Sequence, residues 1–140
     1  MTVGSAYVEE IHRLHRAISD WTTGAVPNTE ETFAAFAESF ATGFIIINPN
    51  GVSEAAATVI ARFRERYCER SGRNFSIRIT DEDVRYIFDE RALVVYKEHW
   101  LQGPDVQSVI LSSALMQADL SRPGGIAWLH LHETWLLAPA

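Results

Sequence analysis

The sequence has a single cysteine, Cys68, so no disulfide can form within the chain and we expect a reducing, cytoplasmic location. It also lacks any run of basic residues, and 12 Lys and Arg against 18 Asp and Glu give a formal net charge of −6. Nucleic acids and anionic membranes attract basic surfaces, so we expect neither as a partner. The longest apolar run, Phe44–Ile47, is far too short to cross a bilayer, and the N-terminus lacks the pattern of a signal peptide.

Several motifs of catalytic and cofactor sites are also missing. Gly124 and Gly125 fall in a predicted hairpin rather than in a loop that could hold a phosphate, and no nucleophile elbow is present. The pair Ser112-Ser113 has no histidine obviously tied to it, so we expect strand residues rather than a nucleophile. No cofactor is therefore predicted.

Helical spacing dominates the first 70 residues. An amphipathic helix is predicted over residues 5–22, with a stripe of apolar residues at Tyr7, Ile11, Leu14, Ile18 and Trp21. Asn28 and Glu31 predict the capped start of a second helix, whose buried face is Phe33, Phe36, Ala37 and Phe40. A third helix is predicted with Ser53 as its cap and with an inner face of Ala56, Ile60, Phe63 and Tyr67.

Strand patterns dominate the rest. A short strand, Phe44–Ile47, ends at the turn Asn48-Pro49-Asn50-Gly51. Alternating residues from Phe75 to Phe88, with a bulge at residues 81–83, are followed by strands at Ala92–Leu101, Val106–Leu120 and Ile126–Leu137. Helices segregated from an antiparallel meander indicate one α+β domain over residues 1–140, in which the helices cover one face of a curved sheet. Such an arrangement can enclose a cavity for a small molecule.

The order helix, helix, strand, helix and four long antiparallel strands resembles the NTF2-like (SnoaL-like) superfamily over nearly the whole chain. The turn at residues 48–51 and the final strand Trp128–Thr134 are similar to motifs of that superfamily, and residues 132–136 are similar to an uncharacterised bacterial branch. The resemblance implies a cone-shaped half-barrel, a pocket between sheet and helices, and a homodimer packed through the sheet. It does not imply one function, because this fold hosts several kinds of enzyme and non-catalytic binders.

Asn48 occupies the place where the similar steroid-isomerase segment has its catalytic aspartate. An amide cannot act as a general base, but it can hydrogen-bond a ligand. The nearest equivalents of the family's acidic hydrogen-bond donor are Ser112 or Ser113, of which Ser113 is assigned to the ligand site. The tyrosine on the family's first helix has no secure counterpart here, so a ketosteroid-isomerase mechanism is not expected.

Glu98 is the first candidate catalytic residue. Comparison with the family favours an inward face made of Val94, Tyr96, Glu98 and Trp100. A carboxyl group between two aromatic rings is poorly solvated, which favours its neutral form as a general acid or base needs. The alternative interpretation is a cross-strand ion pair with an arginine such as Arg78 or Arg85.

The last strand leaves two arrangements open. If Leu129, Leu131, Glu133 and Trp135 face inward, Glu133 joins Glu98 and the histidines lie on the outer surface, in a dimer interface. If the other face is inward, His130 and His132 could form a metal or acid/base cluster with Glu98. No third metal ligand is evident from spacing, so no metal is predicted. Glu133 and His132 join Glu98 as candidate catalytic residues.

Three functions follow. The first is a pocket that binds a small apolar or aromatic molecule, lined by Trp21, Phe44, Tyr96, Trp100 and Trp135. The second is a lyase, isomerase or cyclase that uses Glu98 or Glu133 as acid/base, and the third is an interaction module based on a dimeric sheet. The missing catalytic aspartate favours the first.

Overall fold

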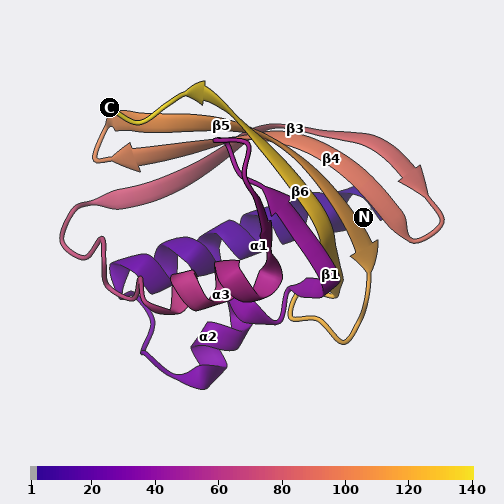
Figure 1. The fold of residues 1–140 in the computed structure, drawn as a ribbon, viewed down its shortest axis with the longest axis horizontal. Coiled ribbons are helices and arrows are strands. Elements are labelled where there is room, and N and C mark those ends of the chain that lie inside the picture. Colours follow the sequence, from indigo (N-terminus) through magenta and orange to yellow (C-terminus); the bar gives the residue numbers. More distant parts are fainter. Residues whose placement is uncertain (1–2) are drawn as a thin grey trace.

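A computed structural model describes residues 3–140 and places three helices on one face of a curved sheet (Figure 1). The helices are α1 (Val3–Thr23), α2 (Glu30–Ala37) and α3 (Ala56–Arg64). The strands are β1 (Phe40–Ile47), β2 (Ser53–Ala55), β3 (Phe75–Phe88), β4 (Arg91–Gln102), β5 (Asp105–Ala118) and β6 (Ile126–Leu137). The predicted α+β architecture is confirmed.

The six strands form one sheet in the order β2-β1-β6-β5-β4-β3. Strands β3 to β6 are the predicted antiparallel meander, whereas β1 lies parallel to β6 at the far side of that meander. The strand predicted at Phe44 begins earlier, at Phe40, which was expected on the second helix. The pairing of β1 with β6 shifts register between Phe40 and Ile45, and the rings of Phe40 and Phe44 are both buried in the core.

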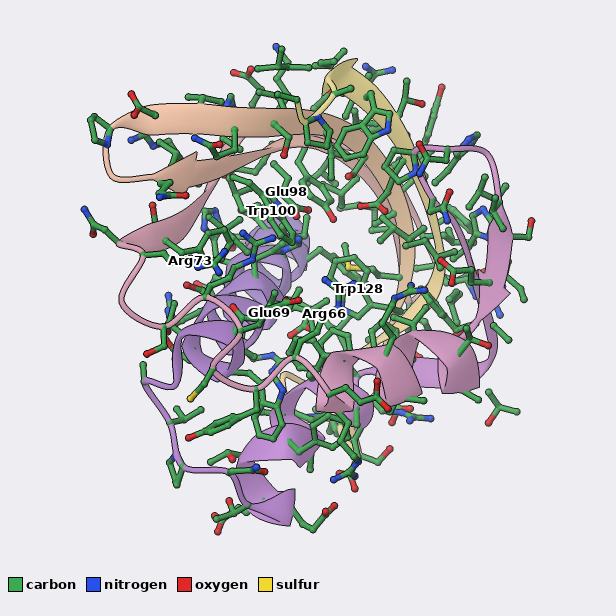
Figure 2. All side chains as sticks on the ribbon, turned by 60° about the vertical axis from the view of Figure 1, so that its left-hand side comes forward. Arg66, Glu69, Arg73, Glu98, Trp100 and Trp128 are labelled. Atoms are coloured by element: carbon green, nitrogen blue, oxygen red, sulfur yellow. The ribbon has the colours of Figure 1, made fainter. Side chains whose placement is uncertain are left out.

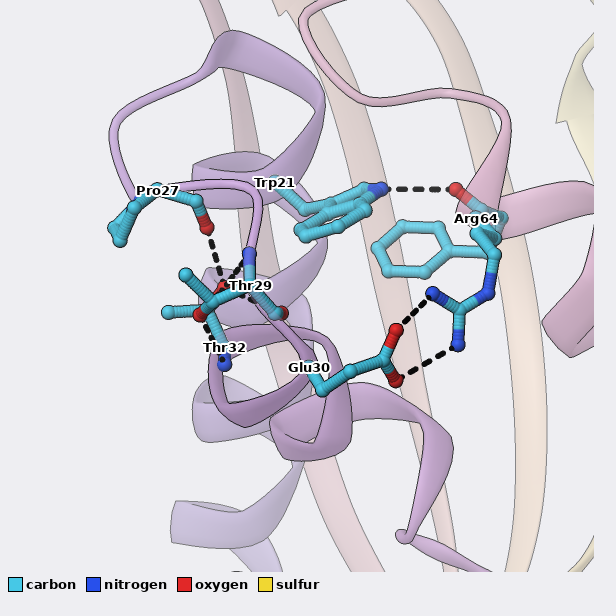
Figure 3. Close-up of polar contacts among 7 residues, drawn as sticks. Trp21, Pro27, Thr29, Glu30, Thr32 and Arg64 are labelled. Carbon is cyan, nitrogen blue, oxygen red and sulfur yellow. Dashed lines mark hydrogen bonds and ion pairs between the residues drawn. The ribbon is translucent and has the colours of Figure 1, made fainter.

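The apolar stripe of α1 is buried at Tyr7, Ile11, Leu14 and Trp21 and partly buried at Ile18, and α1 packs mainly against β3. At its C-terminal end, Trp21 packs against Phe33, Phe63 and Tyr67. The Trp21 indole N–H donates to the Phe63 carbonyl at 2.9 Å, which fastens α1 to α3 (Figure 3). This aromatic cluster closes one end of the core.

Two predicted helix caps are wrong. Thr29, not Asn28, caps α2: its hydroxyl accepts the Thr32 N–H, while the Thr32 hydroxyl accepts the Thr29 N–H (Figure 3). A threonine thus takes the place that the sequence suggested for Glu31. Ser53 lies in β2, where it pairs with β1, and α3 begins after Ala55 without a side-chain cap.

Bulges decide which side chains face the helices. The bulge predicted at residues 81–83 is present, because the pairing of β3 with β4 shifts between Thr80 and Asp83. A second shift, between Leu115 and Met116 opposite β6, breaks the alternation of the last strand. Trp128 and Leu131 are consequently both buried, although a regular strand would place them on opposite faces.

Candidate functional site

A cavity of about 200 Å³ lies between the helices and the inner face of the sheet. Aliphatic and aromatic side chains make most of its wall: Leu14, Ile18, Phe36, Phe40, Phe44, Ile46, Val59, Phe63, Trp100 and Leu131. Its polar groups fall into two sets: the inner set is His15, Thr22, Glu98 and Glu133, and the outer set is Arg62, Arg66, Glu69 and Arg70. The inner carboxylates come from the sheet, whereas the outer set comes from α3 and the segment after it (Figure 2).

His15 and Glu98 form a buried pair in this cavity, with relative exposures of 5% and 4%. His15 Nδ1 lies 2.7 Å from the Ile11 carbonyl oxygen, which can only accept, so Nδ1 carries a hydrogen. His15 Nε2 lies 2.8 Å from Glu98 Oε1. A hydrogen bond between these two atoms needs a second proton, either on Nε2, which makes the imidazole positively charged, or on the carboxyl group. The indole N–H of Trp100 donates to the other Glu98 oxygen, which favours an ionised carboxylate.

The pKa shifts agree with a charged His15–Glu98 pair. Burial alone would raise the pKa of Glu98, but the charge and hydrogen bond of His15 and the hydrogen bond from Trp100 outweigh it, so the pKa is lowered. Burial alone would lower the pKa of His15, but the charge and hydrogen bond of Glu98 outweigh it, so this pKa is raised. Glu98 is therefore a carboxylate already engaged by a cation.

The inward orientation predicted for Val94, Tyr96 and Glu98 is confirmed by their burial, and Trp100 lines the cavity while remaining partly exposed. The arginine partner suggested for Glu98 is wrong. Arg85 pairs instead with Asp83, and Arg78 is exposed. Helix α1 supplies a histidine where cross-strand pairing suggested an arginine.

Glu133 is the second inner carboxyl group. On the sheet it lies in one cross-strand row with Tyr96 and Ser112, from β4 to β6. Its carboxyl group makes no hydrogen bond or ion pair within the described residues. Burial, followed by the negative charge of Glu98, raises its pKa to about 8, against a smaller opposing effect of His15. A carboxyl group of this kind can give or take a proton near neutral pH.

Tyr96 and Ser112 complete this row, and their hydroxyl groups are buried without a hydrogen bond of good geometry in the described part of the chain. Burial and the nearby charges of Glu98 and Glu133 raise the pKa of Tyr96 well above its ordinary value, partly offset by the adjacent Ser112 hydroxyl. The Tyr96 ring packs edge-on against His15, with centroids 5.6 Å apart. Tyr96 does not line the cavity but packs against His15, which does.

Several predicted ligand residues lie elsewhere. Asn48 closes the β1–β2 turn, where its side-chain oxygen accepts the Asn50 and Val52 N–H groups. Trp135 is partly exposed and donates its indole N–H to Asn50 at 3.1 Å. Neither lines the cavity, and the polar groups of both are engaged at this turn. Trp21 is likewise absent from the cavity wall and serves the aromatic core cluster.

The outer face of the sheet takes the remaining candidates. Ser113 lies there, opposite Val95 and His132, and its neighbour Ser112 faces inward instead. His132 is exposed, so the predicted cluster of histidines with Glu98 does not form. Glu133 lines the cavity together with Glu98, as expected if the face with Leu129, Leu131, Glu133 and Trp135 points inward. Within residues 3–140, no group of three or more His, Cys, Asp or Glu side chains is placed to hold a metal ion.

Two parts of the site had only weak signals in the sequence. His15 sits between Leu14 and Ile18, which places it beside the buried stripe, but nothing local links it to a carboxylate 83 residues away. Arg62, Arg66 and Arg70 recur at intervals of four, which is the spacing of one helical face. That spacing could have indicated a cationic cluster beside the third helix.

No helix in the described part of the chain is long and apolar enough to cross a membrane.

Comparison with known proteins gives a family match over most of the chain. Residues 9–137 match the model for the sucrose-6-phosphate phosphohydrolase C-terminal family. Sucrose-phosphatase 2 of Nicotiana tabacum is 20% identical over 127 residues, covering 91% of this chain and 30% of that protein. Sucrose-phosphatase 1 of the same organism is 21% identical over 131 residues, covering 94% and 31%. The chain thus spans less than a third of the length of these curated relatives.

Solved structures give the fold. An NTF2-like protein of unknown function from Pseudomonas aeruginosa is 29% identical with a TM-score of 0.80, covering 93% of this chain and 98% of that one. An NTF2-like protein from Cytophaga hutchinsonii is 13% identical with a TM-score of 0.69, covering 97% and 100%. The CaMKII hub of S. rosetta is 14% identical with a TM-score of 0.69, covering 94% and 95%. The resemblance to the NTF2-like superfamily is confirmed, and the chain belongs to the sucrose-6-phosphate phosphohydrolase C-terminal family within that fold.

Proposed function

We propose that this protein binds a small, mainly apolar or aromatic molecule in the cavity between α1, α3 and the sheet. The observation that carries the proposal is the composition of the wall: aromatic and aliphatic side chains surround about 200 Å³, and a few polar groups gather on part of it. Small-molecule sites commonly combine a largely apolar surface with a few fixed polar groups that orient the ligand.

The test is mass spectrometry of the purified protein under native conditions, followed by extraction and identification of any bound molecule. We expect a retained small molecule that disappears in Val59→Phe, because Val59 lines the cavity and a larger ring fills it. The matched control is Thr58→Phe, which adds the same ring at the exposed neighbouring position. Retention of the molecule by Val59→Phe, or its loss in both variants, would place the binding site elsewhere.

A second candidate function is acid/base catalysis on the bound molecule. It is favoured by Glu133, whose carboxyl group lines the cavity, lacks a hydrogen-bond partner among the described residues and has a pKa raised to about 8, mainly by burial. Glu98 is less suited to this role because His15 and Trp100 already hold its carboxylate. We therefore assign Glu133 the acid/base role and His15–Glu98 the role of a neighbouring charged pair.

Deuterium exchange tests this second function. When the co-purifying molecule is incubated with the protein in deuterium oxide above about pH 8, where Glu133 is ionised, a general base that removes a proton from carbon introduces deuterium, which mass spectrometry detects. We expect incorporation with the wild type and little with Glu133→Gln, while the bound fraction of the molecule stays similar. Equal incorporation by both proteins would remove Glu133 from the mechanism.

The same proposal includes a homodimer that packs through the outer face of the sheet in the cytoplasm. Apolar side chains form a stripe on this face across β4 and β5: Leu93, Val95, Val109, Leu111 and Leu115. A second copy would remove these residues from water. Sedimentation equilibrium of the wild type and Leu111→Glu tests this: a dimer that the charged variant dissociates is expected, whereas a monomeric wild type would contradict it.

A further inference from the structure

Arg70 is a partly buried cation at the cavity wall. Its backbone N–H donates to the Thr22 carbonyl at 2.8 Å, which fixes this segment against the end of α1. Its guanidinium lies 4.4 Å from the ring centre of Phe75 and 4.7 Å from that of Trp100. The two rings hold the guanidinium by cation–π contact beside the cavity, next to the indole that binds Glu98.

The charges around the cavity do not balance. Arg62 is neutralised by Glu54, with which it forms two hydrogen bonds of 2.6 and 3.0 Å. Arg66 has a longer contact of 3.6 Å with Glu69. Arg70 makes no ion pair within residues 3–140, and its Nε is buried without a hydrogen-bond partner there.

The inner polar groups do not supply the missing negative charge. His15 and Glu98 cancel one another, and Glu133 keeps its proton at neutral pH because burial, with the nearby charge of Glu98, raises its pKa to about 8. Burial also lowers the pKa of Arg70, with further lowering by Arg66 and Arg73 and an opposing effect of Glu69. Arg66, Glu69 and Arg73 come from the same stretch of chain as Arg70 (Figure 2). The cavity thus carries an uncompensated positive charge at Arg70.

We propose that the ligand carries an anionic group, a carboxylate or a phosphate, that pairs with the Arg70 guanidinium while its apolar body fills the inner cavity. This inference rests on the proposed binding function and adds the chemical class of the ligand. The planar guanidinium suits either anion, because it presents several N–H donors in a fixed fork. The buried Arg70 Nε–H lacks a hydrogen-bond acceptor among residues 3–140, which is unfavourable, so an anion that accepts from the guanidinium gains affinity.

The experiment compares four probes by isothermal titration calorimetry: phenylacetate, its neutral analogue phenylacetamide, phenyl phosphate and inorganic phosphate. We expect at least one aromatic anion to bind about tenfold tighter than phenylacetamide, as one charge-assisted contact can supply. The comparison of phenylacetate with phenyl phosphate distinguishes the two anionic groups. Inorganic phosphate reports how much affinity the anion has without an apolar body.

Three variants locate the contact. Arg70→Gln removes the charge and should bring the anion-to-amide ratio to within about threefold, whereas Arg70→Lys keeps the charge and should retain a preference for the anion. Arg78→Gln makes the same change in net charge at an exposed position on β3 outside the cavity, and should leave the ratio unchanged. Thermal unfolding of each variant establishes that it is folded.

The outcomes separate the two proposals. Equal binding of phenylacetate, phenyl phosphate and phenylacetamide would overturn the anionic group and leave the apolar pocket standing. Loss of the anion preference in Arg78→Gln as well as in Arg70→Gln would also overturn it, because the effect would then come from net charge. If inorganic phosphate binds as tightly as phenyl phosphate and phenylacetamide does not bind, the contact of an anion with Arg70 is supported. The proposal that an apolar part of the ligand fills the inner cavity is then wrong.

Discussion

Two buried carboxylates, Glu10 and Glu98, are held in the same way in two regions of the molecule. Each pairs with a cation from α1, and each accepts the indole N–H of a tryptophan from the sheet. Glu10 accepts two hydrogen bonds from Arg13, of 2.6 and 2.8 Å, and one of 2.8 Å from Trp128. Glu98 has His15 in place of the arginine.

The difference lies in the cation and in the surroundings. Arginine side chains are permanently charged partners, unlike histidine. Arg13 also donates to the Ala35 carbonyl and the Ser39 hydroxyl, so it joins α1 to the end of α2. Gly124 lies so close that a Cβ there would stand 1.9 Å from a Glu10 oxygen. Neither Glu10 nor Arg13 lines the cavity. The Glu10 cluster therefore has a structural role, whereas the Glu98 pair can change its protonation where a ligand would bind.

The largest expected effect is on the Glu10 cluster. Glu10→Gln leaves the Arg13 charge without its partner, and we expect a loss of about 3–5 kcal/mol in the free energy of unfolding, measured by urea denaturation. The control is Glu30→Gln, which breaks the exposed pair with Arg64 and should change the free energy far less, because water screens this pair. Similar losses in both variants would show that burial does not distinguish the two ion pairs.

The next effect, of about 1–3 kcal/mol, is expected for Glu98→Gln. The loss is smaller because His15, unlike Arg13, can release its proton once the carboxylate is gone. The pKa of His15 should then fall, because burial lowers it and the charge of Glu98 no longer raises it. Titration of the His15 ring by NMR measures the fall. A His15 that stays protonated at neutral pH in this variant would contradict the assigned ion pair.

The elements that carry the two carboxylates could be predicted from the sequence, but the long-range partner of Glu98 could not. The stripe Tyr7–Trp21 and the alternation of β4 predict the helix, the strand and the inward side of Glu98, because each period is set by local backbone geometry. The His15–Glu98 pair joins residues 83 positions apart, and local spacing carries no information on which long-range partner a buried carboxylate meets.

The last strand was ambiguous for a different reason. A bulge between Trp128 and Leu131 moves both residues to the inner side, so neither of the two regular faces describes the whole strand. Asn48 lies away from the cavity, and its amide oxygen serves the turn that contains it. Turn and bulge geometry therefore decided which polar residues reach the cavity.

Over a single unit of pH, the smallest expected effect is the change in stability at Glu133, the third carboxyl group in the comparison. Burial and the charge of Glu98 raise its pKa from an ordinary 4.5 to about 8, so the folded protein keeps a proton that the unfolded chain releases between these values. Wild-type stability should fall as pH rises through this window, by up to about 1.4 kcal/mol per pH unit from this group. Glu133→Gln lacks this term, so the free energies of unfolding of the two proteins should separate between pH 5 and 8 and stay separated above it. Both proteins keep the His15–Glu98 pair, whose stabilisation is lost as pH rises through the raised pKa of His15, so this loss is common to the two curves. If the curves of unfolding free energy against pH are parallel, Glu133 ionises normally and is not the acid of the cavity.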